Sequence, residues 1–386
     1  MKILIIHTKY AQSGGEDAVV IQETALLKQS HDVEVLYFQN QTGIKGMFQF
    51  LGSIWNLSAG RIVRSKINQF QPDVVHLHNF HFASGPFIMR LIHKMGVPMV
   101  QTLHNYRLLC PSAILLHDNQ LFLDSLQQKF PWSAVRKRVY RNSVVLTCWL
   151  AIVFWCHKKI GTFKMVDKYI CLTEFSKQLM LESQLELESH QVVVKPNFTK
   201  ISEQTQELNR GNHFLFVGRL SAEKGIDVLL AAFENTEYRL RIVGDGPLRE
   251  IVKHKANEYT NITYLGSLSS EDVNIQLKQA QALVFPSICY ETFGLTIIEA
   301  FSNYCPVIAA HIGAPKYLIE NNKNGFHFEA GNAMDLKAKL SEWMKLSDSK
   351  KEEFRHQAFR SYQTLYAPEQ QRQYFDDIYT SVLKLE

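Results

Sequence analysis

Short apolar runs recur along the chain, and most of them are continuous rather than alternating with polar residues. Residues 1–8 read MKILIIHT, and similar runs occupy residues 31–38, 72–80 and 97–105. A continuous apolar run of this length predicts a strand that is buried on both faces, as in a parallel sheet. Helical segments lie between these runs, so the order of elements predicts an α/β domain built from βαβ units.

The alternation of strand and helix resumes after an irregular stretch. Residues 106–123 predict an insertion without regular structure, and residues 131–160 predict helix. Two further strands are expected at residues 167–173 and 191–197, with a helix between them. The first half of the chain therefore predicts one domain with a mainly parallel sheet.

A second α/β domain is predicted after residues 198–212, which are polar and aperiodic and indicate a linker. Short β-rich runs again alternate with helical segments beyond this point. These runs are residues 213–220, 238–244, 261–266, 282–286 and 306–310. Two doubly wound domains agree with a length of 386 residues, because a single core rarely grows beyond about 250–300 residues.

Residues 286–300 read PSICYETFGLTIIEA and place two glutamates around a predicted loop-to-helix junction. Glu291 is expected on the loop, and Glu299 on the second helical turn after Gly294. A carboxylate on so apolar a helix needs hydroxyl or amide donors, and the helix start offers N–H groups that suit a phosphate. This combination predicts a sugar nucleotide. Alternatively, Glu291 favours a helix N-terminus and Glu299 has a structural partner.

A glycine pair follows the first predicted strand. Gly14 and Gly15 lie at a strand-to-helix turn, where backbone N–H groups can approach a phosphate. The same turn uses glycine for its conformation in any α/β fold. The pair therefore allows phosphate binding without requiring it.

Histidines follow two neighbouring strands of the predicted sheet. The runs at residues 72–80 and 97–105 end in histidine and asparagine, and the carboxyl ends of parallel strands border the ligand crevice of such folds. His76, His78 and His81 suggest zinc, but no acidic or cysteine pattern accompanies them. We therefore expect core or crevice histidines and no metal.

Composition excludes several classes of protein. Hydrophobic residues make up 46% of the chain and charged residues 20%, which excludes a disordered or fibrous protein. The net charge of +5 is too small to indicate nucleic-acid binding. The six cysteines form no C-x-x-C pair, so we expect buried thiols in a reducing compartment. The first residues contain no cleavage site, and a cytoplasmic protein is predicted.

One apolar run has a cluster of positive charges before it. Residues 144–156 are too few to span a bilayer, which takes about 20 residues. With Trp149 and Trp155 exposed, the segment would suit a membrane surface at the inner face of the cell membrane. A core helix with a solvated basic start fits the same pattern. The preceding basic residues are Arg136, Lys137, Arg138 and Arg141.

Several motifs together resemble the GT-B glycosyltransferases, specifically the retaining family-four enzymes that use nucleotide-sugar donors. They are SGGE at 13–16, TLHNYRLLCP at 102–111, VKPN at 194–197, VGRLSAEKG at 217–225, GDGPLR at 244–249 and YETFGLTIIEA at 290–300. The resemblance implies an α/β fold of two Rossmann-like doubly wound domains that face a cleft. It implies an acceptor domain at residues 1–197, a donor domain at 198–367, and a last helix at about 368–386 that packs on the first domain.

The resemblance also implies roles for matching residues. Arg219 and Lys224 match the pair that holds the donor diphosphate, and cations at that place would neutralise a leaving group. Glu299 matches the carboxylate that binds the ribose, and Glu291 the one that addresses the transferred sugar. His104 matches a histidine near the reacting carbon, where it acts by positioning or electrostatics. The implied catalytic residues are His104, Arg219, Lys224 and Glu291, and further donor contacts are implied for Gly14, Gly15, Phe293, Gly294, Leu295 and Thr296.

The implied reaction moves a sugar from UDP-, GDP- or another nucleoside diphosphate sugar to an acceptor hydroxyl, with retention at the anomeric carbon. A sugar or lipid-linked glycan of bacterial surface-polysaccharide assembly is the expected acceptor. The chain contains no D-x-D motif and has cations for the diphosphate, so neither a metal nor another cofactor is expected. At residues 121–128 the chain reads LFLDSLQQ, whereas related chains often have a cysteine-containing turn, and the resemblance does not define the acceptor side.

Other classes of protein are weighed against this interpretation. A dinucleotide oxidoreductase would need a G-x-G-x-x-G motif after a strand, and neither SGGE nor GDGPLR supplies one. A sugar-nucleotide epimerase can have the same two-domain architecture, because a fold does not determine a function. A non-catalytic sugar-nucleotide-binding protein is the third alternative. Incubation with a nucleotide sugar and no acceptor separates the three remaining classes.

Overall fold

The structure is a computed structural model, and it describes residues 1–10, 14–201 and 210–383. Residues 202–209 of the predicted linker and Ser13 of the SGGE motif lie outside the described residues. The chain divides into two compact units. Unit 1 contains Met1–His117, Phe122–Asn197 and the described residues from Gln371 onward, and unit 2 contains Asp118–Leu121 and the described part of Phe198–Gln370.

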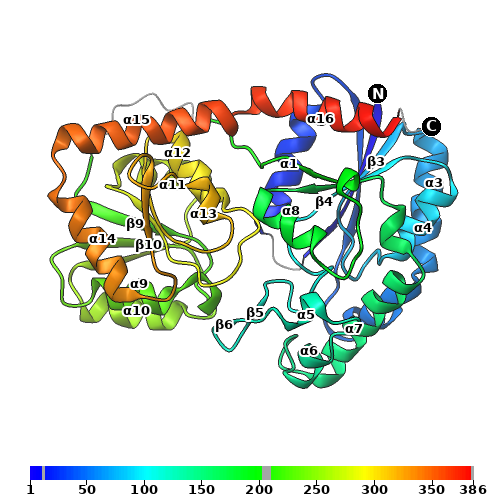
Figure 1. The fold of residues 1–386 in the computed structure, drawn as a ribbon, viewed down its shortest axis with the longest axis horizontal. Helices are drawn as coiled ribbons and strands as arrows, with labels where there is room; N and C mark the ends of the chain where they lie inside the picture. Colours follow the sequence, from blue (N-terminus) through cyan, green and yellow to red (C-terminus); the bar gives the residue numbers. More distant parts are fainter. Residues whose placement is uncertain (11–13, 202–209, 384–386) are drawn as a thin grey trace. The chain divides into compact units, whose positions relative to one another are not determined.

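Unit 1 is built on a six-stranded sheet in the order β2-β1-β3-β4-β7-β8, in which all pairs are parallel (Figure 1). The central strand β1 buries Ile3, Leu4, Ile5 and Ile6 completely, as expected when both faces of a parallel sheet are covered. The strands are β1 (Lys2–Lys9), β2 (Asp32–Gln39), β3 (Val74–Asn79), β4 (Met99–Thr102), β7 (Lys168–Cys171) and β8 (Val192–Val194).

Helices connect these strands and flank the sheet. The predicted irregular insertion contains only short elements, among them the two-stranded sheet of β5 (Leu116–His117) and β6 (Gln120–Leu121). The helices of this part of the chain are α1 (Gly15–Leu27), α2 (Gly43–Leu51), η1 (Gly52–Trp55), α3 (Leu57–Phe70), α4 (Phe87–Lys94), α5 (Asp124–Gln127), α6 (Trp132–Arg136), α7 (Val144–Lys159), η2 (Thr162–Met165), α8 (Glu174–Leu181) and η3 (Ser189–Gln191).

The last helix, α16 (Pro368–Leu383), belongs to unit 1 from Gln371 onward. Asp376 Oδ1 lies 2.8 Å from His31 Nε2, just after α1. The buried Tyr379 hydroxyl lies 2.8 Å from Nδ1 of His76 on β3. The final described residues are therefore part of the core of unit 1.

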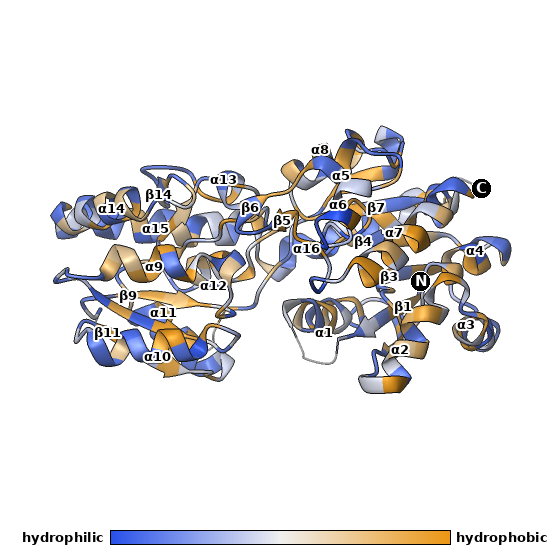
Figure 2. Ribbon diagram, turned by 90° about the horizontal axis from the view of Figure 1, so that it is seen from below, coloured by the Kyte–Doolittle hydropathy of each residue, from blue (hydrophilic) through white to orange (hydrophobic). Residues whose placement is uncertain are grey.

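Unit 2 is built on a second parallel sheet of six strands, in the order β11-β10-β9-β12-β13-β14. The hydropathy colouring shows the apolar character of β9 (Figure 2). The sequence pattern misses β14, which has only four residues and starts with Gly325, where a Cβ would lie 2.1 Å from the Val307 carbonyl oxygen. The strands are β9 (His213–Val217), β10 (Arg239–Val243), β11 (Ile262–Gly266), β12 (Leu283–Phe285), β13 (Val307–Ala310) and β14 (Gly325–Phe328).

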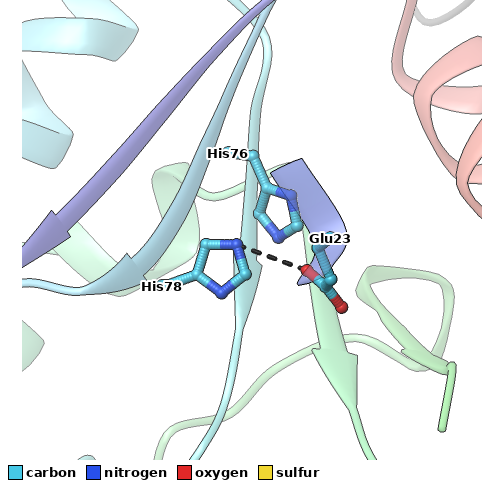
Figure 3. Close-up of side chains that lie close together, drawn as sticks. All are labelled: Glu23, His76 and His78. Carbon is cyan, nitrogen blue, oxygen red and sulfur yellow. Dashed lines mark ion pairs between the residues drawn. The ribbon is translucent and has the colours of Figure 1, made fainter. Parts of the chain in front are cut away.

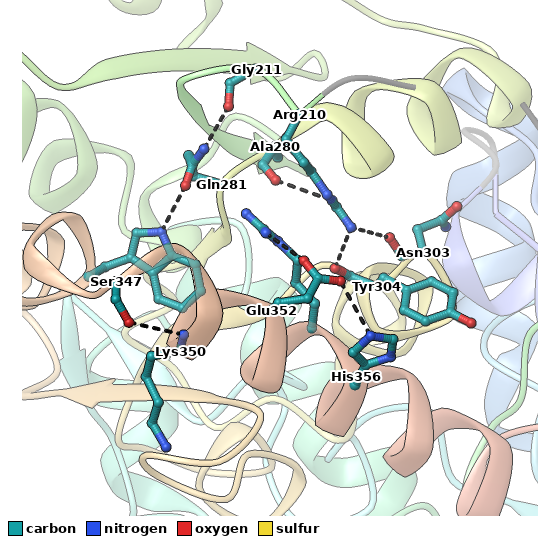
Figure 4. Close-up of polar contacts among 12 residues, drawn as sticks. Arg210, Gly211, Ala280, Gln281, Asn303, Tyr304, Ser347, Lys350, Glu352 and His356 are labelled. Atoms are coloured by element: carbon teal, nitrogen blue, oxygen red, sulfur yellow. Dashed lines mark hydrogen bonds and ion pairs between the residues drawn. The ribbon is translucent and has the colours of Figure 1, made fainter. Parts of the chain in front are cut away.

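Arg210 anchors the chain where it enters this sheet. Its guanidinium donates to four backbone carbonyl oxygens at 2.7–3.5 Å (Figure 4). The acceptors lie on Leu277, Ala280, Asn303 and Tyr304, at the ends of α11 and α12, where helices leave carbonyl groups without partners. The helices of unit 2 are η4 (Ala222–Lys224), α9 (Ile226–Phe233), α10 (Arg249–Glu258), α11 (Ser270–Gln279), α12 (Leu295–Ser302), α13 (Pro315–Leu318), α14 (Ala333–Lys345) and α15 (Asp348–Leu365).

The apolar run at residues 144–156 forms α7. This helix buries Leu150, Ala151 and Val153. Trp149 and Trp155 are half-buried rather than exposed. Hence α7 is mainly a core helix, which favours the second of the two interpretations of this segment. Within the described ranges, no helix has both the length and the apolar character needed to cross a membrane.

Candidate active site

Two loops of unit 2 emerge where the strand order of its sheet reverses. Strand β9 pairs with β10 on one side and with β12 on the other. Ligands of open α/β sheets bind outside the carboxyl ends of the strands at such a point. Residues 218–225 follow β9 and residues 286–294 follow β12, so the predicted donor residues of unit 2 lie at this position in the fold.

Glycine allows these two loops to contact each other. Gly225 has φ 69°, and a Cβ on it would lie 1.9 Å from the Pro286 carbonyl oxygen. Nearby, the Ile288 amide donates to the Glu223 carbonyl oxygen at 3.0 Å. Only glycine permits so close an approach of the backbones in this conformation. The contact brings the side chain of Lys224 to the loop that carries Glu291.

Lys224 and Glu291 form an ion pair. Lys224 Nζ lies 2.6 Å from Glu291 Oε1, and the Ser287 hydroxyl donates to the same oxygen at 2.7 Å. Burial lowers the pKa of Lys224, but the Glu291 carboxylate together with Cys289 and Glu223 raises it, so the net pKa lies above its ordinary value. The amine is charged at neutral pH. The sequence assigned the two residues to different parts of a donor, and the structure joins them directly.

Arg219 and Glu299 have no such partner. Arg219 is exposed, and no described residue forms an ion pair or hydrogen bond with its guanidinium. Glu299 is half-buried on α12, and within the described chain its carboxylate has no hydrogen-bond or ion-pair partner. Burial raises the pKa of this carboxyl. A partly desolvated carboxylate without a donor is suited to bind hydroxyl groups.

The start of α12 provides backbone donors in the same loop. Gly294 precedes the helix with φ 123°, a conformation that favours glycine. The amides of Leu295 and Thr296 lie in the first turn, where an α-helix has no acceptor of its own for them. Phe293 is buried, and its ring contacts Tyr366 edge to face at 5.9 Å. Its side chain therefore fixes the loop, while only its backbone can address a ligand.

In unit 1, the glycine pair opens α1. Gly14 and Gly15 are both exposed, and the Gly14 amide donates to the Asp17 carboxylate at 3.0 Å. The next residue, Glu16, was not given a role from the sequence. Its Oε1 accepts from the Asn105 amide group at 2.9 Å, and its Oε2 has no hydrogen-bond partner among the described residues. Burial raises the pKa of Glu16 to about 7.

His104, at the end of β4, belongs to a cluster of histidines. His104 Nε2 lies 2.9 Å from His78 Nδ1. Burial lowers the pKa of His104 to about 4, although the nearby Glu23 carboxylate raises it. His78 is fully buried, and its Nε2 lies 3.4 Å from Glu23 Oε2 (Figure 3). His104, the histidine predicted from the sequence, is therefore linked through His78 to the buried Glu23.

Glu23 was not singled out from the sequence. It lies on α1 among apolar residues, with no exposed side-chain surface, and its Oε1 accepts from Lys195 Nζ at 2.9 Å. The available signal was a glutamate within the apolar face of α1 and a lysine directly after β8. Neither residue indicates a site until the fold brings the two together.

The same cluster contains the histidines considered as zinc ligands. Glu23, His76 and His78 have ligand atoms within 4.8 Å of one another, and this is the group of potential metal ligands found among the described residues. His81 is not a member; it is buried and its ring packs on Phe82 at 3.7 Å. Of the three histidines considered and not favoured as zinc ligands, the structure therefore brings only His76 and His78 together.

Comparison with known proteins agrees with the fold and the motifs. Residues 13–203 match the sequence family described as Glycosyltransferase Family 4, and residues 197–361 match the one described as Glycosyl transferases group 1. The fold is that of the GT-B glycosyltransferases. The chain belongs to family four of these glycosyltransferases.

Similar proteins and a solved structure support this assignment. An uncharacterized glycosyltransferase of Methanocaldococcus jannaschii is 24% identical over 357 residues, which cover 89% of this chain and 88% of that protein. The O-antigen chain mannosyltransferase C of Escherichia coli is 36% identical over 115 residues, 29% of this chain and 31% of that protein. The crystal structure of Anabaena HepE with UDP has a TM-score of 0.68 at 18% identity, covers 99% of this chain and 100% of its own, and shows the shared fold.

Proposed function

We propose that the protein is a retaining glycosyltransferase that moves a sugar from a nucleoside diphosphate sugar to an acceptor hydroxyl during assembly of a bacterial surface polysaccharide. The observation that carries this proposal is that charged side chains and the start of a helix lie together at the switch point of the unit 2 sheet. There, the Lys224–Glu291 pair lies on loops that also carry Arg219 and lead into α12. Cations and helix N–H groups suit a diphosphate, and carboxylates suit sugar hydroxyls.

Each donor residue then has a role. Lys224 and Arg219 bind the diphosphate and stabilise the negative charge that develops as it leaves. The amides of Leu295 and Thr296 act on the same phosphates. Glu299 accepts hydrogen bonds from the ribose, and Glu291, held by Lys224, accepts from hydroxyls of the transferred sugar. The solved HepE structures contain UDP and UDP-glucose, which supports a nucleotide-sugar donor here.

The reaction breaks the bond between the anomeric carbon and the diphosphate oxygen. In a retaining reaction without a covalent intermediate, the acceptor hydroxyl attacks from the face that the diphosphate leaves, and the leaving phosphate takes the hydroxyl proton. We assign His104 of unit 1 to holding a hydroxyl group of the transferred sugar or the acceptor. The cationic residues supply the charge stabilisation that a metal provides in other transferases.

The test of this proposal starts with binding. We expect one nucleotide sugar of a UDP, GDP and dTDP panel to raise the melting temperature, because a ligand that binds only the folded state stabilises it by mass action. Incubation of that sugar without acceptor should then release the nucleoside diphosphate slowly. A changed sugar on an intact nucleotide would instead identify an epimerase. Binding without any turnover would identify a non-catalytic binding protein.

The cellular setting follows from the relatives and remains part of this proposal. The Escherichia coli relative is named as an O-antigen chain mannosyltransferase, and O-antigen is a surface polysaccharide. We therefore expect a hexosyltransferase that acts on a growing, lipid-linked glycan at the inner face of the cell membrane. Such an acceptor requires the protein to approach a lipid surface.

An exposed apolar stripe on α2 suits that contact. The α2 stripe consists of Ile44, Met47, Phe48 and Leu51, which are 73%, 53%, 67% and 46% exposed. Their i, i+3, i+4, i+7 spacing places them on one side of the helix. Figure 2 shows α2 at the periphery with hydrophobic residues along it. Residues 35–72 contain no aspartate or glutamate, which suits an anionic bilayer.

The segment that carries the basic residues contacts α2 through the buried Phe50, which is not part of this stripe. The Phe50 carbonyl on α2 accepts from the Trp149 indole at 3.0 Å, and the Phe50 ring stacks on Tyr140 at 6.3 Å. Exposed basic residues surround Tyr140 in the sequence. We place the membrane contact on the α2 stripe with these cations around it, and not on the buried face of α7.

Vesicle binding tests this placement. Ile44→Ser with Phe48→Ser should weaken binding to vesicles of phosphatidylglycerol and phosphatidylcholine about 100-fold, because two large exposed side chains lose the free energy of burial in lipid. Met334→Ser, at a residue of unit 2 that is 77% exposed, is the control and should leave binding unchanged. Replacement of Arg136, Lys137 and Arg138 by glutamate should abolish the preference for anionic lipid. Equal binding by all variants would remove the membrane contact from the proposal.

A further inference from the structure

A chain of buried side chains connects His104 to an ion pair inside unit 1. His104 Nε2 lies 2.9 Å from His78 Nδ1, and the two rings stack with centroids 5.2 Å apart. His78 Nε2 faces Glu23 Oε2 at 3.4 Å. Glu23 Oε1 accepts from Lys195 Nζ at 2.9 Å. Because the side chains of His78, Glu23 and Lys195 have no exposed surface, the chain reaches the surface only through the half-buried His104.

The carboxylate determines which nitrogen of His78 carries a proton. Glu23, paired with the Lys195 ammonium, can accept hydrogen bonds but cannot donate them. A bare His78 Nε2 facing this carboxylate would leave two buried acceptors against each other, which is costly. At 3.4 Å the two atoms form an ion-pair contact and no hydrogen bond, and neither has a hydrogen-bond partner in the described part of the chain, so a proton on His78 Nε2 is attracted to the carboxylate. His78 Nε2 therefore carries the proton.

The protonation of His104 follows from that of His78. Burial keeps the pKa of His78 well below its ordinary value, so the ring is neutral at pH 7 and its Nδ1 is bare. Since His78 Nδ1 can only accept, His104 Nε2 must donate across the 2.9 Å contact. A neutral His104 then has its lone pair on Nδ1.

We propose that Glu23 and His78 are positioning residues that hold His104 in the Nε2–H tautomer, so that its Nδ1 accepts a hydrogen bond from a sugar or acceptor hydroxyl group. The identity of that hydroxyl group rests on the proposed function, whereas the tautomer does not. Lys195 keeps the inner end of the chain ionised and fixed. In this arrangement a residue about two side chains away from the ligand decides whether His104 accepts or donates.

The contacts of His76 argue against a metal at the same place. His76 Nδ1 is hydrogen-bonded to the Tyr379 hydroxyl, and His76 Nε2 is hydrogen-bonded to the Thr102 hydroxyl, both at 2.8 Å. A metal ion would have to displace one of these partners. It would also bring a second positive charge to Glu23, which already holds the Lys195 ammonium. Glu23 and His78, drawn with His76 in Figure 3, therefore serve the chain that leads to His104 rather than a metal ion.

The test inverts the chain without leaving a buried charge. In the double variant Glu23→Gln with Lys195→Met, the glutamine amide can donate to His78 Nε2, which moves the His78 proton to Nδ1. His78 then donates to His104 Nε2, and His104 must carry its proton on Nδ1. The control is Tyr379→Phe, which removes a buried hydrogen bond from His76 but leaves the chain intact.

The measurement is the ring nitrogen spectrum of the full chain with ¹⁵N-labelled histidine at pH 7, with His104 assigned by comparison with His104→Gln. We expect the Nε2–H tautomer of His104 in the wild type and in Tyr379→Phe, and the Nδ1–H tautomer in the double variant. An Nδ1–H tautomer in the wild type, or no inversion in a folded double variant, would overturn the assignment. Stoichiometric zinc in the purified protein, lost on mutation of His78, would also overturn it.

Turnover provides a second, separate readout. With UDP-glucose as the probe, the double variant should release UDP on the order of 10²-fold more slowly than Tyr379→Phe, with a similar KM for the nucleotide sugar. Equal rates in the two variants, together with an inverted tautomer, would overturn the role of Nδ1 in the reaction. Absence of turnover in the wild type would count against UDP-glucose as the donor, while the tautomer assignment would still stand or fall on the spectrum.

Discussion

In unit 2, the charged residues at the edge of the sheet keep contact with solvent, whereas the charged residues behind the corresponding edge of unit 1 are sealed inside. The side chains of Lys224 and Glu291 are 27% and 15% exposed. Those of Lys195 and Glu23 are not exposed at all. Both pairs join a lysine to a glutamate at 2.6 to 2.9 Å. The pairs therefore differ in surroundings more than in chemistry.

The difference shows how the same ion pair can serve two purposes. An accessible pair can exchange partners, since a ligand can bring its own charge and hydroxyl groups to both members. A sealed pair cannot exchange partners without a large desolvation cost, so it fixes the geometry of the groups around it. Under the two proposals made above, unit 2 keeps its charges for recognition, and unit 1 uses them to orient His104.

The sharpest test of this contrast removes one member of the sealed pair. Lys195→Met should lower the free energy of unfolding by about 3–5 kcal/mol, because Glu23 is left buried without its counter-charge. Chemical denaturation at pH 7 measures the loss. Adding Glu23→Gln should restore most of it. If the single variant were as stable as the wild type, the pair would not be sealed, and the contrast between the units would disappear.

Removal of the lysine from the accessible pair should act on turnover instead. Lys224→Ala should reduce kcat by about 10²- to 10³-fold, the usual cost of losing one group that stabilises developing charge. The control is Lys255→Ala, since Lys255 is also 27% exposed and also paired with glutamate at 2.9 Å. Release of nucleoside diphosphate from the selected donor measures both. A Lys224→Ala enzyme as active as the control would separate the ion pair from catalysis.

Glu16 lies between the two cases, because it is largely buried but has only a neutral donor, Asn105, on one of its oxygens. Burial raises its pKa from 4.5 to about 7 in the folded state. The folded protein then retains a proton that the unfolded chain loses. Its contribution to stability is complete below the unfolded pKa and disappears as pH rises through the folded pKa.

This contribution can be measured by difference. Between pH 4.5 and 7, wild type should lose at most about 3 kcal/mol of unfolding free energy relative to Glu16→Gln. Glu250→Gln, at a side chain that is 80% exposed, should follow the wild type. Parallel pH profiles for wild type and Glu16→Gln would mean that the carboxyl is ionised throughout and better solvated than its surroundings indicate.

Much of the architecture could be predicted from the sequence, because parallel strands buried on both faces are read as continuous apolar runs. The strand of unit 2 that the pattern missed is β14. It contains Gly325, where the nearby Val307 carbonyl oxygen leaves no room for a side chain. Local patterns do not contain such tertiary constraints. Residues that share one loop, such as Glu291 and Gly294, are different, because their spacing in the sequence is enough to place them together.

The network of unit 1 could not be found in this way. Glu23 and Lys195 are separated by 172 positions along the chain and neither stands out in its own segment, while His78 was considered only as a zinc ligand or as a core or crevice histidine. Only the strand order, which places β3 beside β4, brings His78 to His104. The exposure of Trp149 and Trp155 could not be predicted for a related reason, since an apolar helix looks the same in sequence whether protein or lipid covers it.

The smallest effect should come from Glu299, and it separates recognition from structure. Glu299→Gln should raise the KM for the donor about 10-fold with kcat nearly unchanged, because the carboxylate binds the ribose equally well before and during reaction. Stability should stay the same or rise slightly, since the variant removes a partly desolvated carboxyl that has no partner among the described residues. Initial-rate kinetics with the donor give KM and kcat, and chemical denaturation gives the stability. A variant with unchanged KM and lower stability would show that Glu299 holds α12 in place, and unit 2 would then contain a structural carboxylate of the kind found in unit 1.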